Sequence, residues 1–209
     1  MFLSESDKQS ITARVAALEK ATGVEVVTLV TAKSDTYPEA VWKAFALGAS
    51  LTALVVAVGE ALHPDWVSTW AVFSAAVTIL GVGAACALAA AYVPGVARLF
   101  IRTSRTALET TQHARARFLE RGLFATRERT AVLLFVSMLE RRVVIVADTG
   151  FDRRVTKDEW DAVIATVTQH LRDGQVGAAV LAGLAAIEAL LAGKGFVRGD
   201  GNAFADGPV

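Results

Sequence analysis

Two long apolar segments separated by a short loop constrain this chain more than any other feature. No Asp, Glu, Lys or Arg occurs between Ala44 and Gly59, and none occurs between Trp66 and Ala97. A bilayer core requires about 20 mostly apolar residues for each helical span, and both segments are about that long. The loop between them is too short to hold a domain. Residues 44–97 are therefore predicted to form a transmembrane helical hairpin.

The alternative is a pair of buried helices inside a soluble domain. A soluble helix of this length normally keeps a polar stripe on its solvent side, but the interior of the second segment offers only Ser74 and Thr78 besides its glycines. Small residues also recur four positions apart, as at Gly81 and Ala85. That spacing lets two spanning helices approach closely. Both observations favour the membrane hairpin.

Basic residues near the ends of the spans predict the orientation. They lie on the side of the chain termini and are Lys43, Arg98, Arg102 and Arg105. The connecting loop, which contains Asp65, has no Lys or Arg. Basic residues stay on the cytoplasmic side, so an integral protein of the inner (cytoplasmic) membrane is predicted, with its soluble domain and both termini in the cytoplasm. The net charge of +0 gives no case for nucleic acid, whereas the local basic excess suits membrane lipid.

The chain outside the hairpin is predicted to form one α/β domain in two pieces. Residues 1–43 offer only one helix and one strand, and fewer than about 40 residues rarely bury a sufficient core. They are therefore expected to complete a domain with residues 98–192, which the hairpin at 44–97 interrupts. Residues 193–209 contain several glycines and Pro208, and we expect a flexible tail there.

Capping signals and periodicity predict the elements of this domain. Ser6 and Gln9 fit a capping box at the start of a first helix, and Gly23 ends that helix. Thr156 and Glu159 form a second capping box, ahead of an amphipathic helix. The other predicted elements are a strand at 24–31, a helix at 98–121, strands at 131–137 and 143–147, and a helix at 176–192. The apolar strands predict a sheet covered on both faces.

Motifs around the second and third predicted strands resemble the TPM-domain family. The matching segments are Ala114-Arg-Ala-Arg-Phe118, Val132-Leu-Leu-Phe-Val-Ser137 and Glu140-Arg-Arg-Val-Val-Ile-Val-Ala-Asp148, then Gly150, Val155 and Trp160. Over about residues 110–192, their order and spacing resemble a bacterial, membrane-attached branch of that family. The resemblance implies an α/β fold, a small TPM-like α/β sandwich, here interrupted by the two-helix transmembrane hairpin. It also implies a divalent-cation or phosphatase-like pocket in some members.

The segment after the third predicted strand holds the candidate metal ligands, which are Asp148, Asp152, Asp158 and Glu159. Hard cations such as calcium (Ca2+) take several oxygen ligands, so these four carboxylates form a candidate calcium site. The alternative is structural and is preferred. Asp148 and Gly150 suit a turn, and Asp158 and Glu159 suit the positive N-terminus of a helix.

Two classes of function remain open. The first is a non-enzymatic, membrane-anchored module that binds a partner protein in assembly or maintenance at the membrane. The second is a weak phosphatase dependent on a divalent metal. The sequence contains no Gly-x-x-x-x-Gly-Lys loop, no Gly-x-Ser-x-Gly elbow and no His-Glu-x-x-His motif. Because no nucleophile, base and oxyanion donor can be assembled from it, the first class is preferred, with membrane lipid and a protein as partners.

Overall fold

The chain forms two compact units in a computed structural model that describes residues 3–34, 37–63, 68–101 and 103–196. The first unit combines residues 1–34 with residues 107–209, and the second consists of residues 35–106. Asp65, Arg102 and most of the predicted tail lie outside the described residues.

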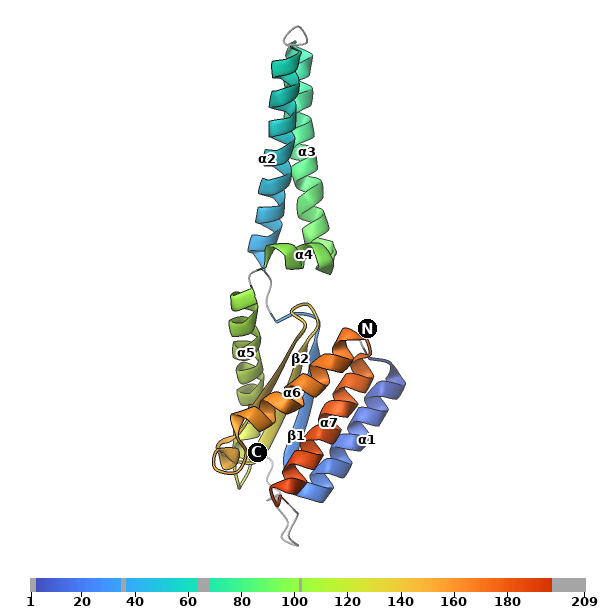
Figure 1. The fold of residues 1–209 in the computed structure, drawn as a ribbon, viewed down its shortest axis with the longest axis vertical. Coiled ribbons are helices and arrows are strands. Elements are labelled where there is room, and N and C mark those ends of the chain that lie inside the picture. Colours follow the sequence, from blue (N-terminus) through green and yellow to red (C-terminus); the bar gives the residue numbers. More distant parts are fainter. Residues whose placement is uncertain (1–2, 35–36, 64–67, 102, 197–209) are drawn as a thin grey trace. The chain divides into compact units, whose positions relative to one another are not determined.

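The first unit is a helix-rich α/β fold around a three-stranded mixed sheet (Figure 1). β1 (Glu25–Thr31) pairs in parallel with β2 (Ala131–Ser137), and β2 pairs in antiparallel fashion with β3 (Arg142–Ala147). The three predicted strands are confirmed, with ends within one residue of the prediction. Parallel strands need a long crossover connection, and here the chain between β1 and β2 includes the whole second unit.

β2 is the centre of the core, because all seven of its residues are buried. Alternate side chains of a strand point to opposite faces of the sheet. On one face, Leu134 packs in a cluster with residues of three helices: α1 (Glu5–Thr22), α6 (Lys157–Arg172) and α7 (Val176–Gly193). On the other face, Phe135 packs in a cluster with Ala114 and Phe118 of α5 (Thr103–Glu120). The sheet is therefore covered on both faces, as its apolar strands predict (Figure 1).

Three helices of the described chain are long and apolar enough to span a membrane, and they differ in burial. In α2 (Pro38–Leu62) and α3 (Thr69–Tyr92), only 6% of the most apolar window is buried, against 44% in α7. The apolar character of α7 is accounted for by the core, because Leu184, Ile187 and Leu191 of α7 are fully buried in it. α2 and α3 pack along each other within the second unit.

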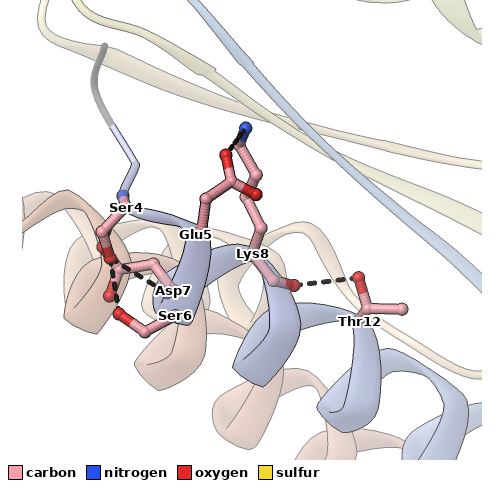
Figure 2. Close-up of polar contacts among 6 residues, drawn as sticks. All are labelled: Ser4, Glu5, Ser6, Asp7, Lys8 and Thr12. Carbon is pink, nitrogen blue, oxygen red and sulfur yellow. Dashed lines mark hydrogen bonds and ion pairs between the residues drawn. The ribbon is translucent and has the colours of Figure 1, made fainter.

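The first helix begins earlier than the sequence predicts. Figure 2 shows its start, where Ser4 is the N-cap and Asp7 completes the capping box. The Asp7 amide donates to Ser4 Oγ (3.1 Å), and the Ser4 amide donates to Asp7 Oδ2 (3.0 Å). The prediction of a Ser6 and Gln9 capping box is wrong, because aspartate at the third helical position closes the box one half-turn earlier. The predicted end is confirmed, since Gly23 adopts a left-handed conformation with φ 73°.

The predicted helix at 98–121 is also wrong at its start. The structure has a short helix, α4 (Pro94–Phe100), then an extended backbone at Ile101, and then α5. No Gly or Pro lies between Arg98 and Gly122, so the sequence carries no breaker at this point. α4 packs against α2 and α3 in the second unit, and this contact is not visible in local periodicity.

The end of α7 differs from the predicted tail that begins at Gly193. Gly193 is still helical, and Phe196 is buried. The Phe196 ring lies 5.1 Å from the Phe151 ring, and the Arg154 guanidinium lies 4.2 Å from the centre of the Phe196 ring. These contacts place Phe196 in the core. Residues 197–209 lie outside the described residues.

Candidate functional site

Asp148 caps the short helix η3 (Thr149–Phe151) that follows β3. The residue is only 5% exposed. Its Oδ1 atom accepts hydrogen bonds from the Thr149 amide (2.7 Å) and from Arg129 Nε (3.1 Å). Its Oδ2 atom lies 3.0 Å from the same Arg129 Nε but accepts no well-aligned hydrogen bond within the described chain. Asp148 is therefore a buried anion held by one cation.

Arg129 has a left-handed backbone (φ 54°), which costs a residue with a side chain about 1–2 kcal/mol. The adjoining turn holds it there. The Gly150 amide donates to the Arg129 carbonyl (2.9 Å). A Cβ atom on Gly150 would lie only 2.6 Å from that oxygen, so only glycine fits this approach. The segment 126–130 is therefore held against the turn after β3 by a hydrogen bond and by close packing.

Glu159 belongs to the capping box of α6 and also joins two helices. It accepts from the Thr156 amide (2.8 Å), and the Thr156 hydroxyl in turn caps the Glu159 amide. Its Oε1 atom lies 2.7 Å from Lys194 Nζ at the end of α7. The hydrogen bond from Lys194, followed by the one from the Thr156 backbone, lowers the pKa of Glu159 to about 2.

This arrangement predicts an acid-sensitive contribution to stability. A carboxyl whose pKa is about 4.3 when unfolded and about 2 when folded stabilises the fold above pH ~4.3, and this contribution is lost as the pH falls towards 2. We expect Glu159→Gln to lower the melting temperature at pH 7 and to match the parent near pH 2. The measurement is melting temperature against pH. Asp158→Asn is the matched control, and its plot of melting temperature against pH should run parallel to that of the parent. If Glu159→Gln lowered the melting temperature by the same amount at every pH, the prediction would be contradicted.

The other two candidate ligands, Asp152 and Asp158, are exposed. Asp152 is the C-cap of η3, and Asp158 lies in the first turn of α6. Among the described residues, no three His, Cys, Asp or Glu side chains form a group that could hold a metal ion. Calcium needs six to eight oxygen ligands, so these described side chains do not fit it as they stand. Calcium binding at the four carboxylates stays a prediction from the sequence.

The structure contains a cavity that sequence reasoning missed. It has a volume of about 290 Å³ and lies between the end of α1, the start of β1 and the segment 126–130. We call it the α1–β1 cavity. Glu19 and Glu25 line it together with Thr130. No motif marks these residues, because Thr130 is far from Glu19 and Glu25 in the sequence, and the parallel pairing of β1 with β2 brings it beside them.

Comparison with known proteins places this fold. Residues 93–190 match the family model described as the TPM domain. The resemblance to the TPM-domain family that the motifs around β2 and β3 predict is confirmed over these residues. The fold is similar to that in the NMR structure of the BA42 protein from the psychrophilic bacterium Bizionia argentinensis. That likeness has a TM-score of 0.54 at 14% identity, over 93% of this chain and 84% of that chain. No curated protein matches the chain.

Proposed function

We propose that this chain is a membrane-anchored TPM-domain protein in which α2 and α3 form a transmembrane hairpin inserted into an α/β sandwich. The observation that carries the proposal is the exposure of large apolar side chains along both helices, such as Leu54, Val55 and Phe73. Water-soluble surfaces rarely expose apolar patches above a few hundred Å². A bilayer would cover these side chains and requires helices of this length.

Close packing between α2 and α3 supports a membrane role. A Cβ atom on Gly48 would lie 2.7 Å from Cys86 Sγ, and one on Gly83 would lie 3.0 Å from the Phe45 ring. Lipid supplies no hydrophobic force to join helices, so spanning helices associate through small residues that permit close van der Waals contact. The glycines at the contact between α2 and α3 are of this kind.

Side chains at one end of the hairpin suit a membrane interface. Trp42 near the start of α2 is 70% exposed, and Tyr92 at the end of α3 is 81% exposed. Within this unit, α4 lies across the ends of α2 and α3 (Figure 1) and exposes Leu99. Lys43 Nζ donates to the Phe100 carbonyl (3.0 Å). Aromatic and basic residues are enriched at headgroup level, so we place this end at the lipid surface.

The orientation gives a topology prediction. Lys43 and Arg98 lie at this end of the hairpin, and basic residues favour the cytoplasmic side. We expect a reporter fused after Val209 to read cytoplasmic and one inserted beside Asp65 to read extracytoplasmic. The opposite pair of readings would reverse the orientation. Two cytoplasmic readings would remove the membrane assignment.

For the biochemical role, we infer a non-enzymatic module that binds a partner protein at the membrane. In the acidic segment, the two least exposed carboxylates are already paired, Asp148 with Arg129 and Glu159 with Lys194. Each would have to give up its cation to take a metal ion. This pairing supports a structural role for the segment and favours partner binding over metal-dependent phosphatase chemistry.

Site-specific photo-cross-linking in native membranes tests this role. We expect cross-linkers at two exposed positions of the first unit, Leu119 and Arg127, to capture a discrete protein, while one at Leu54 of α2 captures none. A phosphatase assay on the purified chain with calcium or magnesium tests the alternative. Hydrolysis of a phosphate monoester that is abolished by Asp148→Asn would overturn the non-enzymatic role.

A further inference from the structure

The α1–β1 cavity has an acidic interior. Glu19 and Glu25 are half-buried within it, whereas Lys20, Arg127 and Glu128 are exposed at its rim. No ion pair joins either interior carboxylate to Lys20 or Arg127 in the described chain. Burial, and then the neighbouring Glu19 carboxylate, raise the pKa of Glu25. The interior therefore holds two carboxylates, and neither forms an ion pair with the cations at the rim.

The two carboxylates differ in their remaining capacity for hydrogen bonds. Glu19 Oε1 accepts from the Val26 amide (3.1 Å), which fixes its side chain at the start of β1. The Glu25 backbone amide donates to the Thr130 carbonyl (3.2 Å) in the parallel ladder. The Glu25 carboxylate has no hydrogen-bond partner among the described residues. It can accept donors from a ligand that enters the cavity.

Thr130 supplies a second, independent polar group. It lines the cavity but is only 7% exposed. Its amide donates to Thr126 Oγ1 (3.1 Å), and its carbonyl accepts from Glu25. No residue in the described ranges hydrogen-bonds its hydroxyl group. The hydroxyl oxygen is not among the fully buried side-chain atoms of the described residues that lack a partner, so it is reached from the cavity and is available to a ligand.

The wall that carries Thr130 is fixed before any ligand arrives. Arg129 is held in its left-handed conformation by Asp148 and by the Gly150 amide. A Cβ atom on Gly150 would also lie 2.9 Å from Thr130 Cγ2, so this side of Thr130 is closed by backbone. A preformed wall lowers the ordering cost of binding.

The chemistry of the interior selects the ligand class. No three described His, Cys, Asp or Glu side chains can converge on one metal ion. Two carboxylates and a hydroxyl spread around a cavity of about 290 Å³ instead suit a cation that carries several N–H donors on a long side chain. We propose that the α1–β1 cavity binds one cationic side chain, an arginine guanidinium or a lysine ammonium group, from the partner protein. This proposal rests on the protein-binding function proposed above.

NMR titration of the full chain in detergent micelles, labelled with carboxyl-¹³C glutamate, tests this proposal. The probes are Nα-acetylarginine N-methylamide and its lysine counterpart, and the neutral control is Nα-acetylcitrulline N-methylamide. We expect the cationic probes to shift the Glu19 and Glu25 resonances saturably, and the citrulline probe to leave them unchanged. Charge-assisted hydrogen bonds carry enough energy that losing one should weaken binding about tenfold.

Single substitutions test whether the cationic probes bind in the α1–β1 cavity. Glu25→Gln, followed by the Glu19 resonance, and Thr130→Val, which keeps the side-chain volume, should each weaken binding about tenfold. Glu120→Gln is the matched control, because Glu120 pairs with Arg117 on α5 and does not line the cavity. Unchanged amide spectra of the variants would show that each is folded.

Three results would overturn the proposal: no shift with either cationic probe, an equal shift with the citrulline probe, or a larger shift with calcium chloride alone. The photo-cross-linking experiment separates this proposal from the proposed function. Capture of a partner without probe binding rejects the cavity proposal and leaves the protein-binding function standing. Selective probe binding without capture supports the cavity and rejects that function.

Discussion

Truncation of Phe135 to Ala is expected to lower the free energy of unfolding of the first unit by about 3–5 kcal/mol. Phe135 lies in the middle of β2, is fully buried, and packs in one cluster with Ala114 and Phe118 of α5. Removing the ring leaves a cavity that the stiff central strand cannot close. Domains of this kind have a total stability of about 5–15 kcal/mol, so the variant should be close to unfolding. Thermal denaturation of the purified full chain measures this.

The control for Phe135→Ala is Leu119→Ala on α5, because Leu119 is large and apolar but exposed. We expect its effect to stay within about 0.5 kcal/mol, as for ordinary surface substitutions. If the two variants lost similar amounts of stability, α5 would not cover this face of the sheet. That result would contradict the packing described for the second face.

The elements that the sequence predicts well are those whose signals are local. β2 is a run of apolar residues with no polar break until Ser137, and its complete burial follows from that run. The box of Thr156 and Glu159 fixes the start of α6, because both partners lie within four residues. Gly23 ends the first helix as predicted and has a positive φ. In each case the residues that determine the structural element lie within it or within a few residues of it.

The predictions that failed depend on contacts between distant segments. α4 ends at Phe100 although no breaker follows it, and it packs on α2 and α3. Phe196 looks like part of a glycine-rich tail, yet its ring reaches Phe151. The first capping box was misplaced for a different reason. Two serines near the N-terminus each precede a polar residue at the required spacing, and the helix begins at the earlier one, Ser4.

The same division applies to the candidate sites. The sequence identifies Asp148 and Glu159 as polar residues near a turn and a helix start, and the structure places them as caps. It does not reveal Arg129 or Lys194, whose ion pairs cross between elements. Nor does it reveal the α1–β1 cavity, because Glu25 and Thr130 become neighbours only when β1 pairs with β2.

The second large effect concerns the pair formed by Asp148 and Arg129. Asp148→Ala removes a buried helix cap and a charge-assisted hydrogen bond, and we expect a loss of about 2–4 kcal/mol in the free energy of unfolding. The loss is smaller than for a fully buried pair, because the Arg129 side chain is 49% exposed and water can solvate it. Thermal or denaturant unfolding of the full chain gives the value.

Two variants of Arg129 separate the ion pair from the backbone conformation. Arg129→Ala leaves a buried carboxylate without its cation, so its cost should equal or exceed that of Asp148→Ala. Arg129→Gly removes the same charge but adopts φ 54° freely, and should recover about 1 kcal/mol relative to Arg129→Ala. Equal stabilities of the Gly and Ala variants would show that the left-handed backbone stores no strain.

Millimolar calcium distinguishes an ion pair from a metal site at Asp148. If calcium raised the melting temperature of the parent but not of Asp148→Asn, Asp148 would be a calcium ligand. Its pairing with Arg129 would then be the arrangement of that site without metal.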